Sequence, residues 1–207
     1  MIPVKVLAVQ YLSAVTPELS RALGTDAPCL GLITTDSDDP TYIALDQATK
    51  DAQVSVCYGR SFYAGAANAS TPHAGEVIGI LAGPTPGAVR SGMESALGEL
   101  ERVGFEEVCG VPCLAHTVSR CGSFLPKEAG VREGTPLAYL IAPPLESMYA
   151  MDAALKAADV KLCKLYTPPT ETNFGGALLT GTQSACAAAC AAFREAVAEV
   201  ANRPKKE

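Results

Sequence analysis

Two stretches of the chain carry apolar residues at alternating spacings of four and three, the pattern of a helix with one buried face. The first stripe consists of Val89, Met93, Ala96, Leu100 and Val103, and the second of Cys186, Cys190, Phe193, Val197 and Val200. Pro86 suits the first turn of the first helix, and Thr182 suits the cap of the second. The pattern therefore predicts helices near 86–103 and near 183–201.

The two helices end two copies of one sequence pattern. With a shift of 106, residues 44–57 align without a gap on residues 150–163, and 7 of 14 positions are identical. Alanine matches mean little in an alanine-rich chain, but four pairs of other residues also match. These pairs are Asp46/Asp152, Lys50/Lys156, Val54/Val160 and Cys57/Cys163. Similarity at one fixed offset indicates an internal duplication.

Each copy predicts the same order of elements, namely strand, strand, helix, strand, strand, helix. In the first copy we expect strands near 4–11, 29–35, 54–58 and 75–82, and helices near 39–53 and 86–103. In the second copy we expect strands near 112–120, 136–142, 160–166 and 176–181, and helices near 145–158 and 183–201. The order predicts an α+β fold in which a small antiparallel sheet with helices packed on it occurs twice.

Gly104 marks the expected boundary, which gives one domain over 1–104 and a second over 105–207. Two similar domains in one chain imply an internal pseudo-two-fold relation. Closed symmetry would then produce a ring with twice as many domains as chains.

Charge and composition exclude several partners. The 207 residues carry a net charge of −6, so the chain offers no basic surface for a phosphate backbone, and we expect no nucleic acid. The longest charge-free run, 172–193, is rich in alanine and broken by glycines, so it is not expected to span a membrane. No secretory signal is recognised, and the eight cysteines are interpreted as thiols of a reducing cytoplasm.

Three cysteines and a histidine lie close together in the sequence, at Cys109, Cys113, His116 and Cys121. Their spacing matches no standard zinc motif, which needs two close pairs of ligands. If 112–120 is a strand, Cys113 and His116 point to opposite faces. We therefore favour core thiols and predict no metal ligands, and without a nucleophile–base pair or a phosphate loop we predict no catalytic residue.

Several longer strings resemble one protein family. The helix pattern Asp-x-Ala-x-Lys-x-Ala-x-Val is similar to that of the bacterial microcompartment (BMC) shell domain. The strings at 37–50, 58–67, 142–146 and 171–174 resemble the EutL family of ethanolamine-utilisation shell proteins. The resemblance implies two tandem, circularly permuted BMC domains of ferredoxin-like type, each with a four-stranded sheet. It also implies a structural protein of the microcompartment shell in the bacterial cytoplasm, not an enzyme.

The assembly and partners also follow from the resemblance. Three chains would form a flat pseudohexameric tile that contacts neighbouring shell proteins and encloses the enzymes of ethanolamine breakdown. A gated central pore would lie on the three-fold axis, with smaller pores within each subunit. No bound cofactor is expected, and a cobalamin-sized molecule is a candidate for passage through the large pore.

Acidic residues precede the helix expected near Pro40. Carboxylates at a helix start stabilise it, but Asp36, Asp38 and Asp39 repel one another, and a bound cation would relieve that repulsion. The resemblance carries ethanolamine recognition onto Asp38 and Asp39, with Glu76 and Phe105 as further matches. Carboxylates accept charge-assisted hydrogen bonds from a protonated amine, so the prediction is binding of ethanolamine without reaction.

Two loops, 59–74 and 167–176, occupy equivalent places in the two copies. Loops of this length in a compact domain are often functional. The resemblance makes them the gate of the central pore. The residues expected at the gate or rim are Phe62, Tyr63, Thr172, Asn173 and Phe174.

Two other functions stay open at the level of sequence. A ferredoxin-like trimeric regulator would bind an effector at its loops, although Arg60 is the one basic side chain there. A carboxylate-dependent enzyme would use the same acidic residues, but acids alone make a poor catalytic set.

Overall fold

The computed structural model describes residues 1–62, 73, 75–168 and 170–205, and it divides into two compact units. The N-terminal unit consists of Pro3–Val103 together with Gly122–Leu125. The C-terminal unit consists of Met1–Ile2, Gly104–Cys121 and Pro126–Glu207. Each unit therefore contains most of one sequence copy plus a short piece from the other half of the chain.

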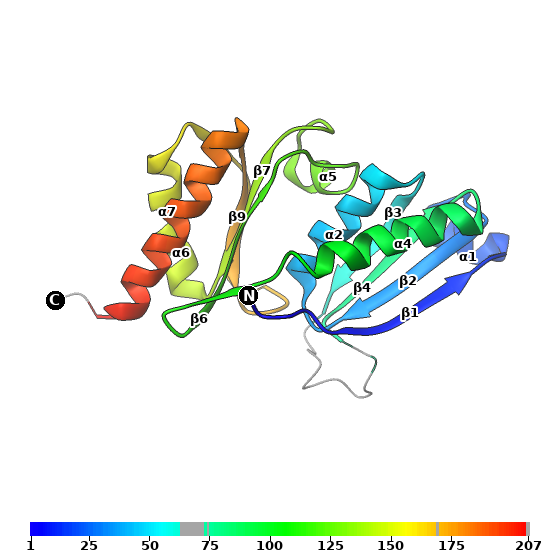
Figure 1. Ribbon diagram of the computed structural model, residues 1–207, viewed down its shortest axis with the longest axis horizontal. Helices are drawn as coiled ribbons and strands as arrows, with labels where there is room; N and C mark the ends of the chain where they lie inside the picture. Colours follow the sequence, from blue (N-terminus) through cyan, green and yellow to red (C-terminus); the bar gives the residue numbers. More distant parts are fainter. Residues whose placement is uncertain (63–72, 74, 169, 206–207) are drawn as a thin grey trace. The chain divides into compact units, whose positions relative to one another are not determined.

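The N-terminal unit is built on an antiparallel sheet of four strands in the order β1-β2-β4-β3. The strands are β1 (Val6–Leu12), β2 (Cys29–Thr35), β3 (Ser55–Ser61) and β4 (Val77–Gly83). The helices are α1 (Pro17–Ala22), α2 (Asp38–Asp51) and α4 (Pro86–Leu100). Figure 1 shows α2 and α4 packed on the same face of this sheet.

The main core of this unit lies between the sheet and the two long helices. All five residues of the first apolar stripe are buried, and the four on α4 confirm the predicted helix face, while Val103 follows the end of the helix at Leu100. Met93, Ala96 and Leu100 pack with Ile33, Leu45 and their neighbours in one cluster. A Cβ at Gly79 would stand only 2.6 Å from Cδ1 of Leu45, so a larger residue there would force the buried Leu45 side chain to shift.

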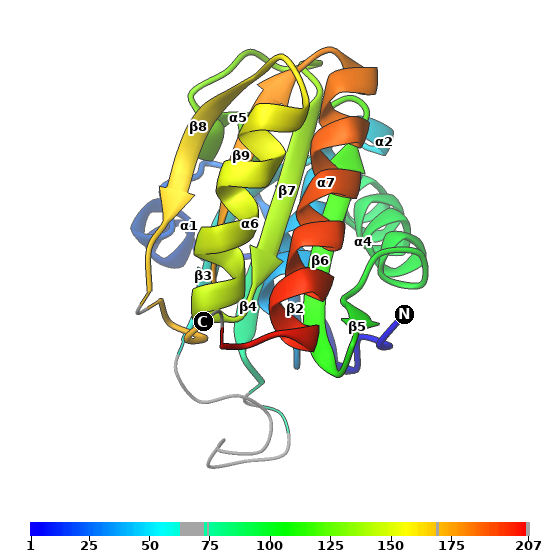
Figure 2. The same ribbon diagram turned by 90° about the vertical axis from the view of Figure 1, so that its left-hand side faces the viewer.

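The C-terminal unit repeats this arrangement with one strand more. Its sheet order is β5-β6-β7-β9-β8. The strands are β5 (Glu106–Val108), β6 (Val111–Val118), β7 (Leu137–Ala142), β8 (Val160–Tyr166) and β9 (Gly175–Gly181). The helices are α5 (Leu125–Ala129), α6 (Pro144–Ala157) and α7 (Gln183–Asn202). Figure 2 shows α6 and α7 side by side across one face of the sheet.

The topology confirms the predicted α+β class and shows the duplication directly. The strand order β6-β7-β9-β8 repeats β1-β2-β4-β3, and each long helix follows the equivalent strand. Both copies also carry a register shift in their edge strand, in one copy between Val56 and Tyr58 and in the other between Leu162 and Lys164. Cys57 and Cys163, one of the repeated pairs, are therefore the bulged residues of the two strands.

Three short elements differ from the sequence expectation. β5 adds a fifth, three-residue edge strand to the second sheet, where four strands were expected. α1 and α5 have six and five residues, too few to show a helical period in the sequence. These pieces are formed by local turns and edge pairing, which leave no periodic pattern.

The cysteines behave mainly as core residues. Cys113, Cys121, Cys186 and Cys190 are buried thiols, as the core interpretation predicts, whereas Cys109 is exposed in a turn with a positive φ of 51°. Within the described ranges, no group of three or more His, Cys, Asp or Glu side chains is arranged to hold a metal ion. No helix of the described part of the chain is both long and apolar enough to cross a membrane.

Candidate functional site

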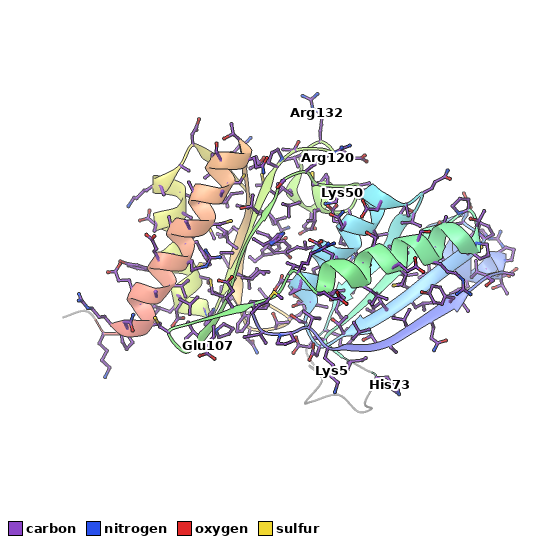
Figure 3. The ribbon with its side chains drawn as sticks, viewed as in Figure 1. Lys5, Lys50, His73, Glu107, Arg120 and Arg132 are labelled. Carbon is purple, nitrogen blue, oxygen red and sulfur yellow. The ribbon has the colours of Figure 1, made fainter. Side chains whose placement is uncertain are left out.

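An acidic cluster, which we define as Asp36, Asp38, Asp39 and Glu76, lies in the N-terminal unit where β2 ends and α2 begins. Asp38 and Asp39 occupy the first turn of α2 and are each only 7 % exposed. The backbone N–H of Asp39 donates to Oδ1 of Asp38 at 2.9 Å. Asp36 accepts a 2.7 Å hydrogen bond from the backbone N–H of Lys5, which precedes β1 (Figure 3). These carboxylates are thus held in place by the backbone around them.

The N-cap of α2 does not use an acidic side chain. Ser37 stands at the cap and makes no side-chain capping bond. Its carbonyl instead accepts hydrogen bonds from the hydroxyls of Thr35, at 2.9 Å, and Thr41, at 2.7 Å. Asp38 and Asp39 in the first turn therefore favour the helix start through their charges and not as N-caps.

Glu76 directly precedes β4, the strand that pairs with β2. Its backbone N–H donates to the carbonyl of Thr35 at 2.8 Å, and its carbonyl accepts from the N–H of Phe62 at 2.9 Å. Gly75 before it has a positive φ of 66°, and a Cβ there would collide with the same Thr35 carbonyl. Only a glycine therefore lets the chain bring Glu76 this close to β2.

The carboxylates of the cluster affect one another electrostatically. Burial raises the pKa of Glu76 to about 7, and the negative charges of Asp38 and Asp36 add to the shift. Burial also raises the pKa of Asp38, although backbone hydrogen bonds and one from Ser61 oppose the rise. The pKa of Tyr42 is raised by burial and by the charges of Asp38 and Asp39, against a hydrogen bond with Ser61. A cation bound here would relieve this accumulation of negative charge.

Phe105, the fourth predicted ligand residue, belongs to the C-terminal unit. Its side chain is buried, and its carbonyl accepts a hydrogen bond of 2.6 Å from the N–H of Ile2. The ring of Phe174 packs against it edge to face, with the centroids 5.7 Å apart. The structure thus brings Asp38, Asp39 and Glu76 together, and it joins Phe105 to a residue predicted for the pore rim.

The residues predicted for the gate lie on two connections. Phe62 follows β3 and is half-buried, and its N–H bond to Glu76 ties it to the acidic cluster. Tyr63 lies outside the described residues. His73, farther along the same connection, is exposed (Figure 3).

The second connection predicted for the gate contains a hydrogen-bonded turn between Thr170 and Phe174. Asn173 has a positive φ of 63°, a conformation that asparagine tolerates better than most residues. Its N–H donates to the Thr170 carbonyl at 3.2 Å, and the Thr170 hydroxyl donates to the Phe174 carbonyl at 2.8 Å. Thr172 is half-buried within this turn. The rim residues Thr172, Asn173 and Phe174 are therefore held in one hydrogen-bonded unit.

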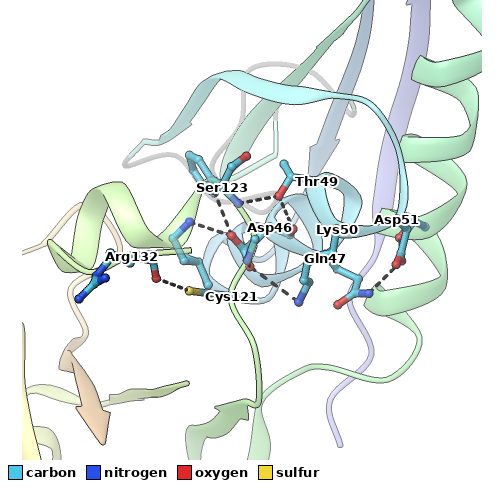
Figure 4. A network of polar contacts seen from close by, with 12 residues as sticks. Asp46, Gln47, Thr49, Lys50, Asp51, Cys121, Ser123 and Arg132 are labelled. Carbon is cyan, nitrogen blue, oxygen red and sulfur yellow. Dashed lines mark hydrogen bonds and ion pairs between the residues drawn. The ribbon is translucent and has the colours of Figure 1, made fainter. Parts of the chain in front are cut away.

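Asp46 has a structural role that the sequence did not predict. Its fully buried carboxylate accepts backbone hydrogen bonds from Gly122 at 2.7 Å, Leu125 at 2.9 Å and Phe124 at 3.1 Å (Figure 4). Lys50, one turn along α2, lies 3.8 Å from the same carboxylate. The sequence signal was the repeated Asp and Lys, but nothing in it indicated a segment 76 residues away as the partner.

Comparison with known proteins places this geometry in a family. The model of the BMC domain matches residues 29–111. The bacterial microcompartment shell protein EutL of Clostridium perfringens is 60 % identical over 205 residues, which cover 96 % of this chain and 94 % of that protein. EutL of Escherichia coli is 49 % identical with the same coverage.

Solved structures agree with the sequence comparison. A crystal structure of EutL from Clostridium perfringens superposes with a TM-score of 0.95 at 59 % identity, covering 98 % of this chain and 95 % of the other. EutL from Leptotrichia buccalis gives a TM-score of 0.96 at 53 % identity, covering 100 % and 98 %. The resemblance found in the sequence is thereby confirmed: the chain belongs to the EutL family of bacterial microcompartment shell proteins.

Proposed function

We propose that this chain is a structural tile of an ethanolamine-utilisation microcompartment shell, and that three copies form one pseudohexameric disc that packs against neighbouring shell proteins. The observation that carries the proposal is the repeated sheet order, with the same bulge in both copies. Two equivalent sheet-and-helix copies, over 1–104 and 105–207, allow three chains to approximate six-fold geometry. The proposed partners are other copies of this chain, other shell proteins and, indirectly, the enclosed enzymes.

We further propose that the acidic cluster binds ethanolamine. At neutral pH the ligand carries an ammonium group, which donates charge-assisted hydrogen bonds to carboxylates. The buried Asp38 and Asp39 and the half-buried Glu76 supply these acceptors, and their negative charges repel one another. Phe105 remains a prediction from the family resemblance as a fourth ligand residue.

We also propose that two connections between strands form the gate of the central pore of the tile. Phe62 and Tyr63 on one connection, and Thr172, Asn173 and Phe174 on the other, form the rim of a central pore around the three-fold axis. The aromatic side chains give the rim bulk to close an opening, and the hydrogen-bonded turn at Asn173 fixes the backbone of Phe174. A molecule the size of cobalamin is the candidate for the open pore.

Calorimetry with ethanolamine tests the binding site. We expect Asp38→Asn and Glu76→Gln each to weaken binding by about tenfold or more, because each removes one of the acceptors for the ammonium group. Asp159→Asn, an exposed carboxylate outside the cluster, is the matched control and should bind as the native chain does. Unchanged affinity in both cluster variants would remove the acidic cluster from the site.

Two measurements distinguish a shell tile from a trimeric regulator and from a carboxylate-dependent enzyme. Electron microscopy of the purified chain should show flat hexagonal layers, whereas isolated trimers without lateral association would favour a regulator. The pKa of Glu76 near 7 is what a carboxylate enzyme would use for proton transfer at neutral pH. Incubation with ethanolamine should leave it chemically unchanged, and measurable turnover would favour the enzyme.

A further inference from the structure

Ser61 ends β3 on the face of the sheet that α2 covers. A Cβ at Gly59, two residues earlier on the same strand, would stand 3.5 Å from Cε1 of Tyr42 on α2. Side chains two residues apart on a strand point to the same face. The half-buried Ser61 side chain therefore points toward the start of α2, where the acidic cluster lies.

The hydroxyl of Ser61 joins two side chains of α2. It is hydrogen-bonded to the carboxylate of Asp38 and to the hydroxyl of Tyr42, and the backbone of Ser61 also hydrogen-bonds Tyr42. Asp38 and Tyr42 are four residues apart, so they are neighbours on one face of the helix. An ionised carboxylate only accepts, so Ser61 donates to Asp38, and the Ser61 oxygen accepts from Tyr42. The three groups thus form a chain of hydrogen bonds that ends on Asp38.

The end of β3 also holds the other side of the acidic cluster. The N–H of Phe62, the residue after Ser61, donates to the carbonyl of Glu76 at 2.9 Å. Ser61 itself pairs with Val77, the residue after Glu76. One short stretch therefore holds Asp38 through a side chain and Glu76 through the backbone, and it fixes the two residues relative to each other.

The surroundings of Asp38 make the hydrogen bond from Ser61 important. Burial raises the pKa of Asp38, and hydrogen bonds from the backbone, Ser61 and Asp39 oppose the rise. Arg60 is exposed and points to the opposite face of β3 from Ser61. The titratable groups around Asp38 are all acidic or neutral, namely Asp36, Asp39, Tyr42 and Glu76. Hydrogen-bond donors therefore favour the ionised form of Asp38 where its charged neighbours do not.

We propose that Ser61 and Tyr42 are positioning residues of the ethanolamine site, which together direct the Asp38 carboxylate toward the ammonium group. The proposal rests on ethanolamine binding to the acidic cluster, as proposed above. Ser61 acts through Asp38, and Tyr42 acts through Ser61. Donation from Ser61 also keeps Asp38 ionised, and the ionised carboxylate is the form that accepts charge-assisted hydrogen bonds.

Calorimetry with ethanolamine at two pH values tests the role of Ser61. Ser61→Ala should weaken binding about tenfold at about pH 6 and clearly less at about pH 8. Without the hydroxyl the pKa of Asp38 is higher, so protons compete with the ligand at the lower pH, whereas at the higher pH the carboxylate is ionised in both proteins. Ser61→Thr keeps the hydroxyl and should restore the affinity. Ser55→Ala, at the exposed start of the same strand, is the matched control and should bind as the native chain does.

A variant of Tyr42 tests the second positioning residue. Tyr42→Phe removes the hydroxyl and keeps the ring, which packs on Phe124 with the centroids 5.9 Å apart. It should weaken binding about two- to threefold at about pH 6, less than Ser61→Ala, because Tyr42 reaches Asp38 only through Ser61. Native affinity in Tyr42→Phe would overturn the role of Tyr42.

The outcomes separate the positioning role from the binding site itself. Weaker binding in Asp38→Asn together with native affinity in Ser61→Ala overturns the role of Ser61 and leaves the acidic cluster as the site. An equal loss for Ser61→Ala at both pH values also overturns that role, because the effect would then come from altered packing and not from the charge of Asp38. Binding by Ser61→Thr as weak as that by Ser61→Ala does the same. A native chain that does not bind ethanolamine at either pH overturns the site and, with it, the positioning role.

Discussion

Asp46 and Asp152 occupy equivalent positions on α2 and α6, yet the Asp46 side chain is completely buried and the Asp152 side chain is 67 % exposed. Both have a lysine four residues later, so their local sequences predict the same helix surface pair. The difference comes from Gly122–Leu125, which returns to cover Asp46 from a distant part of the chain. The aspartate repeated in both copies thus anchors a distant segment in α2 and lies on the surface in α6.

The Asp46 carboxylate should be essential for stability. Asp46→Ala leaves the backbone N–H groups of Gly122, Phe124 and Leu125 without their acceptor, and we expect a loss of about 2–4 kcal/mol in the free energy of unfolding. Urea denaturation at fixed protein concentration measures it, since stability of an oligomer depends on concentration. Glu195→Ala on the exposed surface should stay within about 0.5 kcal/mol of the native chain. A loss for Asp46→Ala no larger than this control would contradict the assignment.

Gly75 should tolerate no side chain. Alanine there meets both a positive φ and the Thr35 carbonyl, whereas Gly134 has a positive φ of 81° with open space around its Cβ position. Gly134→Ala should therefore cost about 1–2 kcal/mol from the backbone alone, and Gly75→Ala should cost clearly more. Thermal unfolding of both variants compares them, and equal losses would show that the Thr35 carbonyl moves aside without cost.

Stability should fall as pH rises through the range where Glu76 ionises. The pKa of Glu76 is about 7 in the folded chain and 4.5 for an ordinary glutamate, so between these values the folded protein binds more protons than the unfolded chain. The free energy of unfolding therefore falls from about pH 4.5 to about pH 7. The raised pKa of Asp38 acts in the same direction.

Glu76→Gln isolates this contribution. The glutamine does not titrate, so the decline between about pH 4.5 and about pH 7 should become shallower in urea denaturation curves. Ethanolamine, which favours the ionised carboxylates, should stabilise the native chain more at about pH 8 than at about pH 5. A pH dependence identical in the native chain and in Glu76→Gln would contradict the shifted pKa.

The turn at Asn173 should prefer residues that adopt a positive φ. Asn173→Gly is expected to be nearly neutral, while Asn173→Val should cost about 1–2 kcal/mol, because a branched Cβ is crowded in this backbone region. Thermal unfolding measures both, and limited proteolysis at this connection shows whether the valine loosens it. Equal stability of the glycine and valine variants would mean that the turn relaxes to another conformation.

Periodic patterns in the sequence were enough to predict the main elements. The two stripes of apolar residues predicted buried helix faces, because burial repeats with the period of the helix itself. The offset of 106 predicted that one fold occurs twice, and the sheet orders confirm it. The acids at 36–39 were also visible as a group, since neighbours in sequence at a helix start are neighbours in space.

Only the tertiary structure decided what each repeated residue touches. The joining of Glu76 to Asp38, the packing of Phe105 on Phe174 and the burial of Asp46 all depend on segments far apart in the sequence. Periodicity reports which side of an element faces the core, but it does not report which distant segment covers the other side. Two copies with the same local pattern therefore acquired different surfaces, because the connections between their strands pack in different places.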